Sequence, residues 1–199
     1  MFILGLTGSL GMGKSTTAGF FAEAGVPVHD ADAVVHRLYE GEAVAAIEAA
    51  FPGTTSAGKV DRDKLAARVL DTPAALRALE AIVHPLVRQA EARFLAQARS
   101  RGAKVVVLDI PLLLETAGDR RVDAIVVVSA PGDVQRQRVL ERAGMTPDKL
   151  DALLARQMAD SEKRRHADFV VDTSRGFDAA RAQVKEILRA VATMPKRRR

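Results

Sequence analysis

Five apolar runs of strand length recur along the chain, at residues 2–7, 26–29, 104–109, 123–128 and 168–171. The third and fourth runs are continuous and rich in β-branched residues, which is typical of central strands covered on both faces. Segments with helical periodicity lie between the runs and after the last one, at about 178–193. Strands that alternate with helices predict an α/β fold, a three-layer core built on a five-stranded parallel sheet.

The uneven spacing of these strands predicts two helical insertions. About 75 residues separate the second strand from the third, far more than one crossover requires. They read as helices at 32–50, 61–71, 73–83 and 85–101. Thr72-Pro73 and His84-Pro85 each have the form of a helix start with proline in the first turn. About 40 residues separate the fourth strand from the fifth, again helical, and Thr146-Pro147 has the same form.

Residues 8–15 read Gly-Ser-Leu-Gly-Met-Gly-Lys-Ser and fit the phosphate-binding pattern G-x-x-x-x-G-K-[ST]. The pattern requires a strand before it and a helix after it, and both are predicted, with Gly25 at the helix end. A flexible glycine-rich turn is the alternative, which this βαβ context disfavours. Lys14 is placed to reach the β- and γ-phosphates, and the Ser15 hydroxyl to ligate Mg²⁺. We therefore expect ATP to bind at Gly11, Met12, Gly13, Lys14, Ser15 and Thr16.

Composition narrows the class of protein. The chain has 199 residues, 48% of them hydrophobic, enough for one α/β domain with insertions. Cysteine is absent, which excludes disulfides and thiolate metal sites. No leader-like segment and no apolar run of about 18 residues is present, so we expect a soluble cytoplasmic protein that binds no membrane. Asparagine is also absent, so the Asn-Lys-x-Asp motif of GTP-binding switch proteins cannot be built.

The net charge of +5 suggests anionic partners such as nucleotides or phosphorylated small molecules. Aromatic residues make up only 4% and tryptophan is absent, so platforms for stacking nucleic-acid bases are scarce and no nucleic-acid partner is expected. The basic segment 196–199 is interpreted as a solvated chain end.

Two carboxylates, Asp30 and Asp32, follow the second strand directly. Ligands of open parallel sheets bind at the carboxyl ends of the strands, so both acids lie near the γ-phosphate if the first two strands are neighbours. Either could accept the proton of an attacking hydroxyl while the other helps to hold Mg²⁺ through water. The alternative is that one of them only caps the following helix.

Asp109 ends the third apolar run, the arrangement that holds Mg²⁺ in many phosphate-loop enzymes. The loop after it, 110–115, is apolar apart from the carboxylate of Glu115. This loop could contribute to the site, or it could only pack beneath the site as hydrophobic support. The second insertion is rich in arginine, and guanidinium groups suit the charge that develops during phosphoryl transfer. Arg138 and Arg142 stand one turn apart; most of the other basic residues are expected to be solvated or paired with acids.

Together these residues resemble the dephospho-CoA kinase family over most of the chain. The phosphate loop is shared by many kinases, but the downstream elements are more specific. The matching stretches are Leu6-Thr7-Gly8, residues 11–16, Asp30-Ala31-Asp32 with His36, Asp61-Arg62, Leu65, Leu79-Glu80, His84-Pro85, residues 109–113 with Glu115, Gln135, Arg138, Arg142, Arg156-Gln157 and Ala167-Asp168. The departures are Ser9 in place of a usual glycine, Leu114 in place of a common aromatic residue, and Asp172-Thr173-Ser174 in place of an Asp-Asn-x-Gly-like stretch.

The resemblance implies ATP- and Mg²⁺-dependent phosphorylation of the ribose 3′-hydroxyl of dephospho-CoA, giving coenzyme A and ADP. It implies Asp32 as the base, with Lys14, Arg138 and Arg142 as further catalytic residues, Asp32, His36, His84 and Leu112 at the acceptor, and Ser15, Asp30 and Asp109 at the metal. The expected organisation is one kinase domain, a monomer or small homo-oligomer. Its core is 1–31, 102–130 and 166–199, its CoA-binding insertion 32–101 and its lid 131–165.

Two other classes remain open on the residues alone. A nucleoside or nucleotide kinase could share the same core. A nucleotide-dependent switch or regulatory ATPase would transfer nothing to a small molecule, but the long insertion after the second strand disfavours it.

Overall fold

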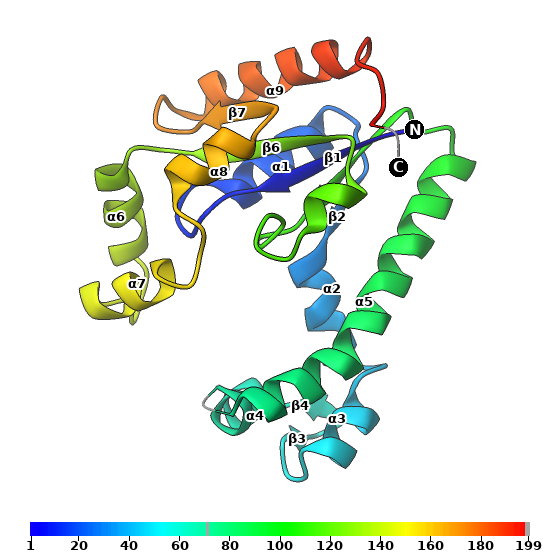
Figure 1. Cartoon of the computed structure of the whole chain (residues 1–199), viewed down its shortest axis with the longest axis vertical. Coiled ribbons are helices and arrows are strands. Elements are labelled where there is room, and N and C mark those ends of the chain that lie inside the picture. Colours follow the sequence, from blue (N-terminus) through cyan, green and yellow to red (C-terminus); the bar gives the residue numbers. More distant parts are fainter. Residues whose placement is uncertain (71, 198–199) are drawn as a thin grey trace. The chain divides into compact units, whose positions relative to one another are not determined.

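The computed structural model describes residues 1–70 and 72–197. The expected helix end at residue 71 and the last two residues of the basic segment lie outside the described residues. The chain divides into two compact units, one made of residues 1–29 with 98–199 and the other of residues 30–97 (Figure 1).

The first unit is built on a five-stranded sheet, as predicted. Its strands are β1 (Phe2–Thr7), β2 (Val28–Asp30), β5 (Val105–Asp109), β6 (Ala124–Ser129) and β7 (Phe169–Asp172). Their order is β2-β5-β1-β6-β7, and β1 pairs in parallel with both β5 and β6, which in turn pairs in parallel with β7. β1 and β2 are therefore not neighbours, because β5 lies between them. The condition under which Asp30 and Asp32 were expected near the γ-phosphate is not met.

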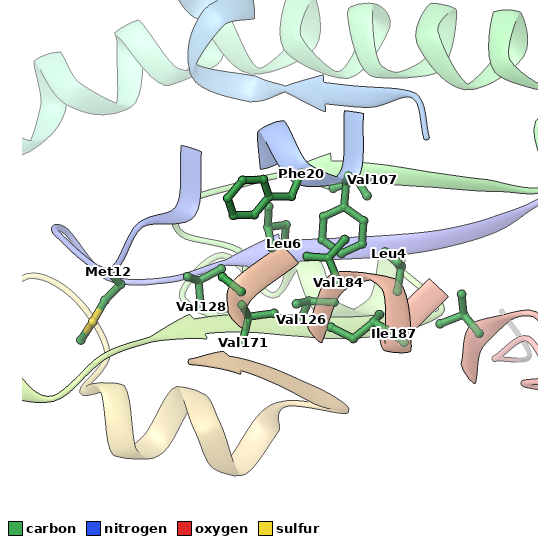
Figure 2. Packing of buried hydrophobic residues seen from close by; sticks show 14 of the residues in the cluster. Leu4, Leu6, Met12, Phe20, Val107, Val126, Val128, Val171, Val184 and Ile187 are labelled. Carbon is green, nitrogen blue, oxygen red and sulfur yellow. The ribbon is translucent and has the colours of Figure 1, made fainter. Parts of the chain in front are cut away.

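Alternation along the central strands directs one set of side chains into the main core. Leu4 and Leu6 of β1 and Val126 and Val128 of β6 are fully buried on the face that α1 and α9 cover (Figure 2). On the opposite face Gly5 leaves room for the next layer, since a Cβ there would lie 2.6 Å from Leu113 Cδ2. The sheet is thus packed on both faces. Strand pairing fixes the register of β1 with β5 and β6, so the carboxyl ends of these strands lie side by side.

The helices of this unit are α1 (Lys14–Glu23), a 3₁₀ turn at Gly118–Arg121, α6 (Gly132–Leu140), α7 (Pro147–Leu154), α8 (Asp160–His166) and α9 (Phe177–Val191). The last helix lies close to its predicted bounds of about 178–193, and the second insertion is helical as predicted, but the 3₁₀ turn was not predicted. Gly25 follows the end of α1 with a φ of 80°, and the Thr146 side chain accepts a bond from the Lys149 N–H as the cap of α7. None of the helices among the described residues combines the length and hydrophobicity that a membrane crossing requires.

The second unit contains α2 (Ala31–Leu38), α3 (Val44–Ala50), the hairpin β3 (Thr55–Ser56) and β4 (Lys59–Val60), and α4 (Arg62–Val69) around their own apolar cluster. The hairpin was not predicted, because two-residue strands carry no alternation signal. The predicted break at His84-Pro85 is wrong: α5 runs without interruption over Pro73–Ser100, and His84 is exposed. Leu79, Val83, Val87 and Ala90 keep helical spacing across the proline and pack into the cluster, which offsets the lost backbone bond.

Candidate active site

The phosphate loop leads from the end of β1 into the first turn of α1. Gly11 and Gly13 have φ angles of 80° and 89°, values that favour glycine, and Gly13 immediately precedes the helix. Gly8 lets the loop pack closely on β6, because a Cβ there would lie 2.7 Å from the backbone oxygen of Val128. A helix N-terminus with inward N–H groups is a binding site for phosphate.

A cavity of about 340 Å³ opens beside this loop, within the first unit. Its lining combines glycines and hydroxyls of the loop with two arginines and an apolar wall. The residues are Gly11, Gly13, Thr16, Thr17, Phe20, Arg138, Arg142, Thr173, Gly176, Phe177 and Ala180. The loop residues and arginines provide an anion-binding end, and Phe20 and Phe177 provide a surface suited to a flat base.

Gly11 fixes how closely the loop and α6 can pack, which gives a first testable prediction. A Cβ at Gly11 would lie 2.4 Å from Val139 Cγ2 and 3.2 Å from the Gln135 oxygen, at a φ that alanine rarely adopts. We expect Gly11→Ala to lower stability by about 1–3 kcal/mol. Chemical denaturation measures this, with Gly132→Ala as control, because a Cβ at Gly132 meets nothing within 4 Å. Equal stabilities would contradict the tight packing of loop and helix.

Lys14 and Asp109 meet at the carboxyl edge of the sheet. Lys14 Nζ lies 2.7 Å from Asp109 Oδ1, and the Asp109 side chain is only 2% exposed. The adjacent loop is tied to β1, since Thr7 Oγ1 donates to the Pro111 oxygen and Ile110 N donates to the Leu6 oxygen. The predicted lysine and the predicted metal-binding acid are thus brought together by the β1–β5 register.

The two predicted arginines have different surroundings. Arg138 donates to Thr173 twice, from Nη1 to Oγ1 and from Nη2 to the backbone oxygen, both at 2.8 Å. Arg142 is exposed and lines the same cavity. Arg136, in contrast, pairs with Asp151 of α7 at 2.9 Å, as expected for a solvated charge.

The aromatic wall of the cavity was missed at the level of sequence. Phe20 and Phe177 meet edge to face with their centroids 6.3 Å apart, and the Arg181 guanidinium carbon lies 4.6 Å from the Phe20 centroid. Phe177 is 72% exposed. The only signal in the sequence was a phenylalanine at the start of the last helix. It indicates a nucleotide site only once the structure places it beside the phosphate loop.

Glu115 and Lys163 form a second unforeseen feature, a buried ion pair at the end of the lid. Lys163 of α8 is fully buried, and its Nζ lies 2.8 Å from Glu115 Oε1, which also accepts from the Met158 N–H. Burial raises the pKa of Glu115, but the Lys163 ammonium and the Met158 N–H together lower it by more, so the net pKa is below the ordinary value of a glutamate. The pair fastens α8 and the end of the lid to the loop after β5.

This lowered pKa predicts how stability depends on pH. A carboxylate with a depressed pKa contributes stability above its unfolded pKa, and the contribution disappears as the pH falls through the folded value. We expect wild type to exceed Glu115→Gln in melting temperature at pH 7, and the difference to shrink progressively below about pH 4.5. Thermal melting of both proteins between pH 7 and 3.5 measures this. A difference independent of pH would contradict the ion pair as its source.

The predicted acceptor residues, and Asp30 of the predicted metal site, are distributed over both units. Asp30 caps α2, with Oδ1 accepting from the Ala33 N–H at 2.9 Å, which is the capping alternative. Asp32 is exposed in the first turn of α2, and His36 stands one turn further on, with its ring nitrogens 3.2 and 3.4 Å from Arg62 Nη1. Leu112 follows β5 and is 40% exposed. The roles of these residues stay predictions.

Ser15 and Asp109 supply oxygen donors suited to Mg²⁺, which is bound in proteins by one or two carboxylates together with phosphate and water oxygens. Within residues 1–70 and 72–197, no three carboxylate, imidazole or thiolate side chains gather into a metal-binding group. The assignment of Ser15 and Asp109 to Mg²⁺ stays a prediction.

The sheet order, the glycine loop opening α1 and the lysine–aspartate pair define a phosphate-loop kinase. The chain belongs to the dephospho-CoA kinase family, whose model matches residues 2–179. It is 64% identical to the dephospho-CoA kinase of Rhodopseudomonas palustris over 198 residues, covering all of both chains. It is 63% identical to that of Bradyrhizobium diazoefficiens, again over 198 residues and all of both chains.

Solved structures agree on the fold. The crystal structure of TT1252 from Thermus thermophilus has a TM-score of 0.85 at 35% identity, covering 97% of this chain and 98% of that one. A dephospho-CoA kinase from Campylobacter jejuni has a TM-score of 0.69 at 23% identity, covering 95% and 96%. At that identity the second likeness supports the fold alone.

Proposed function

We propose that this chain transfers the γ-phosphoryl group of ATP to the ribose 3′-hydroxyl of dephospho-CoA, forming coenzyme A and ADP in the cytoplasm. The observations that carry the proposal are the cavity beside the phosphate loop and the Lys14–Asp109 pair that follows that loop, in a chain that matches the family along nearly its whole length.

The donor half of the site lies in the first unit. ATP places its phosphates against the N–H groups of residues 11–16, with Lys14 donating to the β- and γ-phosphate oxygens. Ser15 and Asp109 would hold Mg²⁺. When it is bound, this ion would neutralise part of the negative charge of the phosphates. The Lys14–Asp109 pair keeps the lysine in place before ATP enters, and the apolar wall with Phe177 takes the adenine ring.

The lid over 131–165 supplies the arginines. Arg142 is exposed on the cavity and free of the Thr173 contacts that fix Arg138, so Arg142 is the one that closes on the γ-phosphate. Arg138 orders the cavity wall and contributes its charge. Arginine at these positions stabilises the equatorial oxygens as negative charge spreads over them in the transition state.

The acceptor half is assigned to the insertion 32–101, with Leu112 after β5. Asp32 accepts the proton of the 3′-hydroxyl while the 3′-oxygen attacks the γ-phosphorus, and the bond from that phosphorus to the β,γ-bridging oxygen breaks to release ADP. His36 and His84 contact the acceptor. Asp30 caps α2 and so fixes the turn that presents Asp32, and its second oxygen assists the metal through water.

Incubation with Mg-ATP and an acceptor tests this function. Mass analysis is expected to reveal coenzyme A when dephospho-CoA is present, and no phosphorylated product with adenosine or other nucleosides. Phosphorylation of a nucleoside without formation of coenzyme A would favour a nucleoside kinase. ATP hydrolysis that is the same with and without either acceptor would favour a regulatory ATPase.

A further inference from the structure

Three side chains from outside the phosphate loop bind its peptide groups. Gln135 Nε2 of α6 donates to the Leu10 oxygen at 2.7 Å, and the Leu10 N–H donates to Gln157 Oε1 at 3.2 Å. Thr173 Oγ1, just after β7, donates to the Met12 oxygen at 2.8 Å. The loop is therefore held by both ends of the lid segment and by the turn before α9.

The two carbonyl contacts determine where the neighbouring N–H groups point. In a trans peptide the C=O and the following N–H point in opposite directions. Gln135 holds the Leu10 carbonyl, so the Gly11 N–H points away from Gln135, and Thr173 orients the Gly13 N–H in the same way through the Met12 carbonyl. Gly11 and Gly13 both line the cavity, and successive inward N–H groups form a concave anion site.

These holding residues are themselves fixed in place. Gln135 is only 8% exposed, and α6 is packed so closely on Gly11 that Val139 leaves no room for a Cβ there. The Thr173 hydroxyl accepts from Arg138 Nη1 while it donates to the Met12 carbonyl, and the Thr173 N–H donates to the Ser129 oxygen. The first turns of α6 are thus anchored on the loop.

We propose that Gln135 and Thr173 are positioning residues for nucleotide binding: by donating to the Leu10 and Met12 carbonyls, they fix these two peptide groups and so keep the Gly11 and Gly13 N–H groups aimed at the phosphates. Gln157 supports them by accepting the Leu10 N–H. The inference rests on the proposed function, since it requires that the cavity takes the phosphates of ATP.

The same substitution at three glutamines separates this role from general effects. Gln135→Glu removes the donor to the Leu10 carbonyl, whereas Gln157→Glu keeps the acceptor for the Leu10 N–H. Gln137→Glu adds the same charge at an exposed position of α6 and serves as the control. Calorimetric titration with Mg-ADP is expected to give a Kd raised about tenfold or more for Gln135→Glu, several times less for Gln157→Glu, and unchanged for Gln137→Glu.

The threonine provides a second, independent pair of variants. Thr173→Val keeps the shape and removes the hydroxyl, and we expect it to raise the KM for ATP while the KM for dephospho-CoA stays constant. Thr173→Ser restores the hydroxyl and is expected to recover most of the ATP affinity. A structural role alone would lower the melting temperature without this split between the two KM values.

The outcomes separate the inference from the proposed function. Wild type that does not bind Mg-ADP would overturn the proposed function. Wild type that binds Mg-ADP, with Gln135→Glu and Thr173→Val binding it equally well, would overturn only the inference. Poor folding of Gln135→Glu leaves the threonine pair to decide.

Discussion

Replacing Lys14 by alanine is expected to lower kcat by about 10²–10³-fold, the usual effect of removing one charged donor from a transition state. Lys14 is only 15% exposed, and its Nζ lies 2.7 Å from Asp109 Oδ1 at the carboxyl end of β5. Because the Lys14 side chain is mostly buried, solvent is poorly placed to replace the lost charge. Steady-state kinetics with saturating Mg-ATP and dephospho-CoA measures the loss.

Two further variants isolate the charge of Lys14. Lys14→Met keeps the aliphatic stem and is expected to be as inactive as Lys14→Ala, so packing is not the cause. Lys185→Ala removes an exposed lysine of α9 and is expected to retain full turnover. A kcat within twofold of wild type for Lys14→Met would contradict the placement of Lys14 at the γ-phosphate.

Replacing Asp32 by asparagine is expected to lower kcat by about 10²–10⁴-fold, the range for a lost general base. Asparagine has nearly the same size as aspartate, and its side-chain oxygen can still accept a hydrogen bond, but it cannot take up the hydroxyl proton. A lower kcat would therefore report on the loss of proton transfer. If the substitution instead mainly raises the KM for dephospho-CoA, Asp32 positions the acceptor and another group takes the proton.

A matched control for Asp32 exists within the second unit. Asp63 is the second residue of α4, behind the capping Asp61, just as Asp32 is the second residue of α2 behind the capping Asp30. Both side chains are exposed. Asp63→Asn therefore changes the same interaction with a helix dipole and is expected to leave kcat unchanged. Equal losses in the two variants would attribute the effect to helix stability.

The sequence was sufficient to predict the features that rest on local patterns. Strand runs, the loop glycines and the Thr146 cap depend on short-range chemistry, and the structure places them as expected. The sheet order was not predictable in the same way. β2 and β5 are both apolar runs of strand length, and no short-range pattern tells which of them lies beside β1.

The missed features all depend on contacts between distant parts of the chain. Pro85 reads as a helix start, but packing on both sides of it overrides the local preference. Lys163 reads as one of several solvated charges, yet folding buries it against Glu115. Thr173 reads as a departure from the family, and its hydroxyl proves to contact both Arg138 and the Met12 carbonyl.

The departure at Ser9 also has a physical explanation. Positive φ angles within the loop occur at Gly11 and Gly13, and Ser9 is not among the residues with a positive φ. Ser9 is buried, and its backbone oxygen accepts from the Met12 N–H at 3.2 Å. A side chain at this position is therefore compatible with the loop.

The central claim is phosphoryl transfer from ATP to the 3′-oxygen of dephospho-CoA, and isotopic tracing tests it most directly. ATP labelled with ¹⁸O in its γ-phosphoryl group is incubated with the protein, Mg²⁺ and dephospho-CoA, and the products are identified by fragment masses. The account predicts that the label appears in coenzyme A, on the ribose 3′-phosphate, in amounts that match the ADP formed. Label found only in inorganic phosphate, or on another position of the acceptor, would contradict it.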